Sequence, residues 1–407
     1  MTVTRSAGGM SETTEPLVLT GGPLDIIGAV PHQLGLHPRD SLVVVCLSRT
    51  PQGRHRLGLT VRADFGTAAA GRLTAEAARA LVRTVEAGGW GDAAVLCFYD
   101  EAFDQALTAA EGQSHPLRRR YRQAAALLQA AFQAEDRAVL AVFGVGARYC
   151  GALTGRAAGE VHPLDRIESG PLATRLVYEG SAPAADLAQA CALPVVAVVD
   201  RERFSAAKEE WRGLRSEDRD RARAEAMLLW MPGAQRLFEA ERLDSHEALL
   251  RSGAVDVDAL AAVAVESWRP SMRDLICVCL ASRRDLRSWH STLRTMPQPR
   301  LVPHPTGRAV AAQLPGLGRT RPVAEEIGRG VRYLAFWAAL EDSPDRARPL
   351  AMMAWLSWAA MHSSKAEHYA QRALEDQPRQ KLGALILDLV RGGATPRWVG
   401  LQATGRA

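Results

Sequence analysis

The chain has 407 residues, of which 47% are hydrophobic and 23% charged, and its formal net charge is +5. This length suffices for two or three domains, and the composition is typical of a soluble globular protein. Because Lys occurs at only three positions, Arg supplies 47 of the 50 cations, and it alternates with acids, as in 217–225, instead of gathering on one face. Such runs predict solvated helices with ion pairs, so nucleic acid ranks lowest among the partners considered.

The cysteines and the apolar runs indicate the compartment. The six cysteines show no Cys-x-x-Cys spacing and no paired framework, which predicts free thiols in a reducing cytoplasm and neither a metal nor a cofactor. Residues 1–20 lack the apolar core of a signal peptide and are expected to form a disordered polar tail. The longest apolar run, 350–361, falls short of the roughly 20 residues that a membrane helix needs, and it predicts a buried helix.

The hydrophobic pattern of the first half alternates between strand and helix. Continuous or alternating apolar runs predict strands, and apolar residues three and four apart predict helices. The run 195–199 could add a strand, although five apolar residues do not separate strand from helix. In chain order, the expected elements are a helix at 23–34, strands at 42–47 and 57–64, a helix at 73–84, a strand at 93–99, a helix at 117–132 and a strand at 139–143.

This alternation predicts an α/β domain over residues 21–200, with a mixed, mostly parallel sheet flanked by helices. The loop 49–55 contains Pro and Gly, which indicates that the first two strands form a hairpin. Pro38 restricts the residue before it to an extended backbone conformation and favours a turn. A tight polar turn is therefore expected between the first helix and the first strand.

Beyond about residue 203 only helical periodicity remains, which predicts an all-helical domain over residues 201–407. Because a solenoid needs about three or more repeats and one candidate unit is found, a single helix hairpin packed on the helical domain is preferred over a repeat array. The candidate unit, at about 345–391, has the small-residue and proline spacings of a tetratricopeptide helix pair, at Ala354, Ala366, Ala373 and Pro378.

The sequence contains no recognisable catalytic motif. Gly144-Val-Gly146 follows a strand, as in a dinucleotide loop, but position 149 is Tyr where that loop requires a third glycine. No GxxxxGK[ST] phosphate loop, GxSxG nucleophile elbow or HExxH metal motif occurs. The ten histidines are scattered, and solvent or helix-capping roles are expected for them. We therefore predict no catalytic residue.

One polar cluster is expected at an edge of the sheet. The loop before the first strand and the end of the second strand lie at the same edge, where ligand crevices form beyond parallel strands. An Arg–Asp pair there could bind an anion through bidentate contacts. In the structural alternative, Asp40 and Ser41 cap the turn, and Arg62 forms a partly buried ion pair with Asp64 or Asp100. The cluster comprises His37, Arg39, Asp40, Arg62, Asp64 and Asp100.

Several blocks of the chain carry a family resemblance. They include 24–45, Val61-Arg-Ala-Asp64, Tyr99-Asp100, 354–358 and Pro396-Arg-Trp398. These blocks are similar to those of the actinobacterial "domain of unknown function 4192" family, which implies this domain order, a cytoplasmic actinobacterial origin and no particular activity. Many members carry a Cys-rich segment ending in Cys-Cys-Pro after the fourth strand, whereas this chain keeps only Cys150 there. The resemblance therefore implies no metal or redox role here.

The missing catalytic motifs and the helix hairpin lead us to expect a non-catalytic interaction or regulatory protein that binds protein partners and no membrane. The alternative is a small anionic-ligand-binding protein, or an enzyme, with its site at the carboxyl edge of the N-terminal sheet. The two differ in whether His37, Arg62 and Asp100 line an open pocket or pair with one another.

Overall fold

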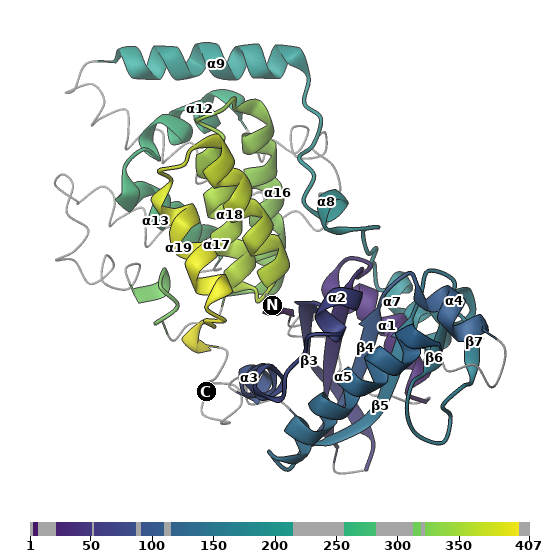
Figure 1. Ribbon diagram of the computed structural model, residues 1–407. Coiled ribbons are helices and arrows are strands. Elements are labelled where there is room, and N and C mark those ends of the chain that lie inside the picture. The colour runs from purple at the N-terminus through teal and green to yellow at the C-terminus, as the bar shows by residue number, and fades with distance from the viewer. Residues whose placement is uncertain are drawn as a thin grey trace.

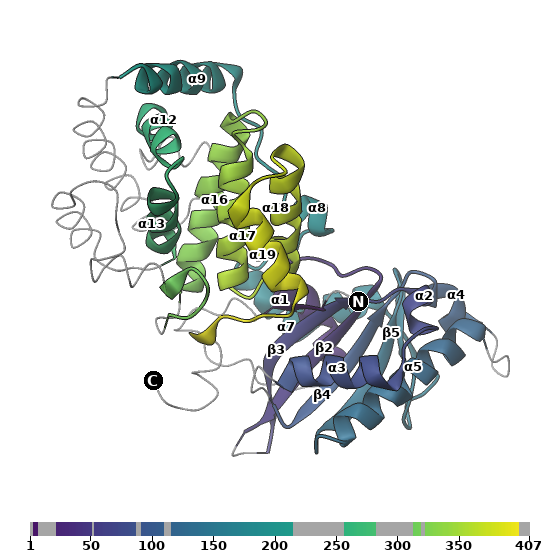
Figure 2. The same cartoon turned by 60° about the vertical axis from the view of Figure 1, so that its left-hand side comes forward.

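The computed structural model shows two parts that lie side by side (Figures 1 and 2). The first contains a seven-stranded sheet with helices on both faces, and the described remainder is helical. The expected order of a mixed α/β part followed by a helical part is confirmed. The described residues are 3–6, 22–50, 53–86, 91–109, 115–214, 256–281, 312–318 and 322–398.

The sheet is mixed and mostly antiparallel. Its strands are β1 Val3–Ser6, β2 Ser41–Arg49, β3 His55–Asp64, β4 Ala93–Tyr99, β5 Ala138–Val145, β6 Tyr149–Ala152 and β7 Val161–Pro163. They are arranged in the order β1-β3-β2-β4-β5-β6-β7, and among these described strands only β4 and β5 pair in parallel. The expectation of a mostly parallel sheet is therefore wrong.

The position of the β2–β3 hairpin explains the error. β3 and β4 do run in the same direction, as the strand–helix–strand alternation predicts, but β2 lies between them and pairs antiparallel with both. A hairpin strand thus separates two strands that a crossover connection makes parallel. β6 and β7 add two more antiparallel pairings, β5 with β6 and β6 with β7. These strands have four and three residues and are too short to be recognised from periodicity.

Helices cover both faces of the sheet (Figure 1). Because successive residues of a strand point to opposite faces, Leu42 and Val44 pack on one side of β2, and Val43 and Val45 on the other. The prediction of a strand covered on both faces is confirmed. The first side carries α2 Thr67–Ala70, α3 Ala75–Glu86, α4 Phe103–Thr108 and α5 Pro116–Gln133, and the second carries α1 Leu24–Leu34, α6 Leu164–Glu168 and α7 Pro171–Tyr178.

The helical part is built around one fully buried helix. All residues of α17 (Ala347–Ala359) are buried, which confirms the buried helix expected near 350–361. None of the helices in the described ranges is long and apolar enough to cross a membrane. Within the described ranges, the other helices beyond α7 are α8 Leu187–Ala190, α9 Val198–Gly213, α12 Val257–Glu266, α13 Pro270–Leu280, α16 Ala324–Leu340, α18 Ser363–Asp376 and α19 Lys381–Arg391.

The structure decides one local question that the sequence left open and corrects one expectation. The run 195–199 forms no strand, because α9 begins at Val198 and Val195 is 86% exposed. Residues 3–6 of the expected disordered tail form β1, which pairs with β3, while the rest of that tail lies outside the described residues. β1 forms by backbone pairing with β3, for which an apolar pattern carries no signal.

α18 lies against the sheet domain. It contacts β1 and α8. The Arg62 Nη1 of β3 donates to the Ser364 hydroxyl at 3.2 Å, and Cys191 forms a side-chain hydrogen bond with Tyr369. α18 therefore packs on the N-terminal part as well as on α17 and α19.

Candidate functional site

The start of β2 and the ends of β3, β4 and β5 lie side by side along one end of the strands, which we call the sheet edge. Ser41 at the start of β2 lies opposite Asp64 at the end of β3 and opposite Tyr99 at the end of β4. Tyr99 in turn lies opposite Val145 at the end of β5. This edge holds the carboxyl ends of the parallel pair, where α/β sheets bind ligands. The register confirms that the turn, β3 and β4 converge as expected.

The turn between α1 and β2 is fixed on both sides. α1 ends at Gly35 with a φ of +69°, a left-handed conformation that glycine adopts without steric cost. The His37 amide then donates to the Ala184 carbonyl at 2.9 Å, and the Asp40 carbonyl accepts from the Phe65 amide at 2.7 Å. These bonds hold the turn above the edge of the sheet.

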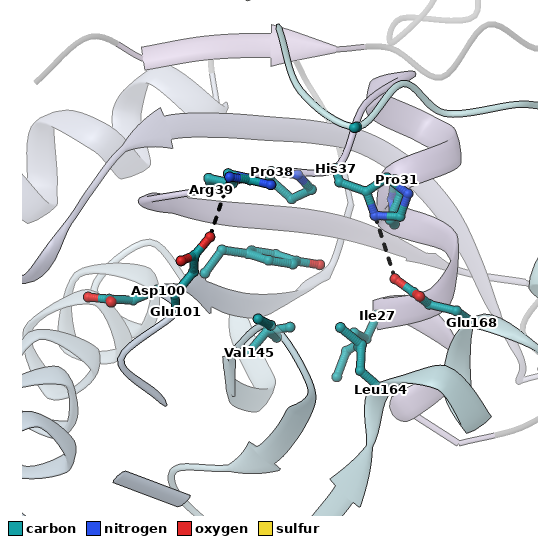
Figure 3. Close-up of a pocket in the computed structure, with 14 residues that line it drawn as sticks. Ile27, Pro31, His37, Pro38, Arg39, Asp100, Glu101, Val145, Leu164 and Glu168 are labelled. Carbon is teal, nitrogen blue, oxygen red and sulfur yellow. Dashed lines mark ion pairs between the residues drawn. The ribbon is translucent and has the colours of Figure 1, made fainter. Parts of the chain in front are cut away.

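A cavity of about 280 Å³ opens at this edge (Figure 3). The turn, the ends of β4 and β5, and helices α1 and α6 surround it. Its apolar lining includes Ile27, Pro31, Pro38, Val145 and Leu164. Its polar lining includes His37, Arg39, Tyr99, Asp100, Glu101 and Glu168.

Two ion pairs stand on opposite sides of the cavity (Figure 3). Arg39 Nη1 lies 3.4 Å from Glu101 Oε1, and His37 Nδ1 lies 3.5 Å from Glu168 Oε1. Neither glutamate is predicted from the sequence. Glu101 only continues the chain after Asp100, and Glu168 belongs to a helix of five residues that periodicity does not reveal.

Asp100 lines the cavity, but its carboxylate is bonded elsewhere. Oδ2 accepts from the Tyr121 hydroxyl at 2.7 Å and from the Thr67 hydroxyl at 2.5 Å, and Oδ1 accepts from the Ala102 amide at 3.0 Å. Figure 3 shows this carboxylate pointing away from the centre of the cavity. Burial, together with the bond to Asp100, raises the pKa of Tyr121 and keeps its hydroxyl a donor. Asp100 thus anchors the connection between β4 and α4.

The other three members of the predicted cluster do not line the cavity. Arg62 pairs with Asp64 at 2.8 Å, its Nε donates to the Ser41 hydroxyl at 2.8 Å, and its Nη1 donates to Ser364. Asp40 occupies the turn with a φ of +41°. The structural alternative therefore describes the pair of Arg62 and Asp64, since the guanidinium links β2, β3 and α18.

The hydroxyl of Tyr99, a residue that lines the cavity, has no hydrogen-bond partner among the described residues. The residue is 7% exposed, and its hydroxyl is buried. Burial, with smaller contributions from Cys97, Cys150 and Glu168, raises the pKa of the phenol well above its ordinary value. The hydroxyl therefore keeps its proton and acts as a donor. The sequence shows Tyr99 only as the last residue of an apolar strand, a pattern that does not mark an unpaired hydroxyl.

The Gly144-Val-Gly146 motif packs against α4. A Cβ atom on Gly144 would lie 2.7 Å from the Phe103 ring, and one on Gly146 would overlap the Asp104 carboxylate. These close approaches require glycine and account for both positions without a bound phosphate.

The described residues contain neither a reactive cysteine nor a cluster of metal ligands. All six cysteines are free and buried. Burial raises the pKa of the Cys150 thiol to about 12 and that of Cys191 to about 11, which keeps both thiols protonated and unreactive. No group of three His, Cys, Asp or Glu side chains among the described residues is placed to hold a metal ion.

The fold and the cavity define a two-part protein in which a mixed-sheet domain carries a pocket at its edge and a helical region follows. The family model described as "Domain of unknown function (DUF4192)" matches residues 23–397, and the chain belongs to this family. The resemblance carried by the N-terminal and C-terminal blocks is thereby confirmed. No curated protein and no solved structure matches the chain.

Proposed function

We propose that this protein binds a small polar molecule in the cavity at the sheet edge. The proposal is carried by Tyr99, which lines the cavity and whose buried hydroxyl has no partner among the described residues. Unpaired buried donors are rare in native proteins because they weaken the folded state. A ligand atom that accepts from this hydroxyl removes that cost.

The place and the size of the cavity support the same function. It lies beyond the carboxyl ends of β4 and β5, where open α/β sheets bind their ligands. Its volume of about 280 Å³ is just below the range of roughly 300–1,000 Å³ for ligand pockets, which suits a small ligand. Apolar walls with a few polar groups are also typical of such pockets.

The charges around the cavity favour an uncharged or zwitterionic ligand over the simple anion expected from the sequence. Among the lining residues, Arg39 is the one arginine or lysine, and it already faces Glu101. The three carboxylates of Asp100, Glu101 and Glu168 outnumber Arg39, and they still outnumber the cations when His37 is protonated. A phosphate or a dicarboxylate would therefore meet a net negative field.

Thermal unfolding in the presence of a metabolite library tests the proposal. A ligand at 100 times its dissociation constant is expected to add about 2.7 kcal/mol to the stability. Ala147→Trp places a large ring in the cavity lining and is expected to abolish the shift, whereas Ala157→Trp, at an exposed position outside the lining, preserves it. A library without a stabilising compound, or a shift that persists in Ala147→Trp, contradicts ligand binding at this site.

A second proposal is that a tetratricopeptide-like hairpin formed by α17 and α18 serves binding of a protein partner. The small residues with the required spacing, Ala354, Ala366 and Ala373, are fully buried, and the two helices pack against each other. Because α18 contacts the sheet domain, we place the partner surface on α19, where Leu385 is 45% exposed.

Affinity capture with paired variants tests this second proposal. Leu385→Glu is expected to release a partner that the unmodified chain retains. Leu140→Glu changes a residue of equal exposure on β5, also 45%, and is expected to retain it. A partner held equally by both variants, or the reproducible absence of any partner, contradicts a partner surface on α19.

We further propose that the protein works in the cytoplasm of an actinobacterium. Its free, buried thiols fit a reducing compartment, and its strong preference for Arg over Lys fits a genome rich in G and C. Fractionation of cells that express the tagged chain tests the compartment, and recovery in the membrane or secreted fraction contradicts it.

A further inference from the structure

The two ends of the cavity differ in what they offer a ligand (Figure 3). At one end, the side chains of Arg39 and Glu101 are 62% and 67% exposed, and such solvated pairs contribute little binding energy. At the other end, Glu168 stands beside His37 and close to the apolar side chain of Leu164. Chemical discrimination therefore depends mainly on the second end.

Tyr99 and Glu168 line the same cavity and carry complementary groups. The protonated phenol has one proton to donate, whereas an ionised carboxylate only accepts hydrogen bonds. Both residues line the cavity, and the charge of Glu168 makes the smallest of the four contributions that raise the pKa of Tyr99. The ion pair with His37 at 3.5 Å involves one oxygen of Glu168, and a carboxylate accepts about four hydrogen bonds in all. Glu168 therefore retains acceptor capacity for a ligand.

This donor and acceptor discriminate between ligand charges. A carboxylate or phosphate that accepted from Tyr99 would lie in the field of Glu168, and like charges repel strongly in a partly buried site. An ammonium group would suit Glu168 but would leave the Tyr99 hydroxyl unpaired. An amide group carries a carbonyl acceptor beside an N–H donor, so it satisfies both residues at once.

Side chains at this end of the cavity can move to admit such a group. The Tyr99 hydroxyl is itself shielded from solvent, so a ligand atom reaches it after a neighbouring side chain changes rotamer. His37 and Glu168 have side chains that are 44% and 37% exposed, and exposed side chains exchange rotamers rapidly.

We propose, building on the ligand-binding function above, that the cavity selects small uncharged molecules with an amide-like group. Carboxamides, lactams and the edges of nucleobases belong to this class. Their acceptor takes the hydrogen bond of Tyr99, and their N–H group donates to Glu168. The side chains of Pro31, Val145 and Leu164 provide apolar walls for the ring or chain that carries the amide.

Matched triplets of probes, titrated into the full-length protein by ligand-observed NMR, test the selection. Each triplet shares one ring, of the pyridine, benzene or pyrrolidine type, and carries a carboxamide, a carboxylate or an aminomethyl group. We expect the carboxamide to bind about tenfold more tightly than the other two members of its triplet. Equal binding, or a preference for the acid or the amine, overturns the selection but leaves ligand binding in place. No binding by any probe overturns both proposals.

Two substitutions assign the preference to its residues. Tyr99→Phe removes the donor and is expected to weaken carboxamide binding about tenfold. Glu168→Gln replaces an acceptor-only group with one that also donates, which is expected to move the preference toward the carboxylate probes. Tyr178→Phe and Glu160→Gln change exposed residues outside the lining and are expected to alter neither property. A carboxamide preference that persists in both pocket variants overturns the assignment.

Discussion

Replacing Tyr99 by Phe is expected to stabilise this protein although it weakens ligand binding. Phe keeps the ring that packs in the core between the sheet and α1, and it removes only a hydroxyl that has no partner among the described residues. An unpaired buried donor costs about 1–3 kcal/mol, and the small void left by one oxygen offsets part of the gain. We therefore expect the free energy of unfolding to rise by about 1 kcal/mol.

Tyr121 provides the matched comparison. It is also a buried tyrosine of the sheet domain, but its hydroxyl donates to Asp100 Oδ2 at 2.7 Å. Tyr121→Phe leaves the buried Asp100 carboxylate with one bond fewer and is expected to lower the free energy of unfolding by about 1.5–3 kcal/mol, the value of a hydrogen bond to a charged group. The same atom is removed in both variants, and the sign of the effect depends on its partner.

Urea denaturation followed by far-ultraviolet circular dichroism measures both changes. Because the sheet domain and the helical part can unfold in separate steps, the transitions are fitted separately, and the midpoint and slope are compared for each. A Tyr99→Phe protein that is less stable than the unmodified chain by about 1 kcal/mol or more would refute the reasoning, because it would show that the hydroxyl is bonded in the folded state.

Three further predictions concern the buried charges and the motif glycines. Lys208→Ala leaves the Glu341 carboxylate buried without its ion-pair partner and is expected to cost about 3–5 kcal/mol in urea denaturation, whereas Arg203→Ala, which breaks an exposed pair, is expected to cost less than about 1 kcal/mol. Burial raises the pKa of Asp345, but hydrogen bonds and charge from Lys208 outweigh it and lower the pKa overall. This contribution to stability is present above the ordinary value of about 3.9 and is lost as the pH falls through the lower folded value, so acid titration of the unfolding free energy should show a loss that shrinks in Lys208→Ala. Gly146→Ala forces a Cβ atom against the carboxylate at the start of α4 and should lower the melting temperature, and unchanged melting would contradict the packing role of this glycine.

The strands that form the sheet edge could be predicted from the sequence, because each strand has a local hydrophobic pattern. The buried runs of β2 and β4 and the alternation of β3 predict three strands within one or two residues of their observed limits. Strand order depends on pairing between segments that are far apart in the chain, which local patterns do not contain. The insertion of β2 between β3 and β4 therefore turned an expected parallel sheet into a mostly antiparallel one.

The candidate site was predictable only in part, for a related reason. His37 and Arg39 line the cavity because a Pro-containing turn holds them above the strand ends. Pro38 allows this turn to be predicted from the sequence. Glu168 arrives from a five-residue helix more than a hundred positions away, which only the tertiary fold determines. The sequence places Tyr99 at the end of a strand and in a block of the family resemblance, but it does not reveal that the hydroxyl lacks a partner among the described residues.

Arg62 shows how one residue type is assigned to binding or to structure by its surroundings. The sequence places it near His37 and Asp100, where a guanidinium would suit an anion. In the structure its side chain is only 14% exposed, and its donors go to Asp64, Ser41 and Ser364. A guanidinium with partners on β2, β3 and α18 joins the sheet domain to the helix hairpin. The cavity is consequently left with more carboxylates than cations, and this charge balance is what moves the expected ligand from an anion to an uncharged amide.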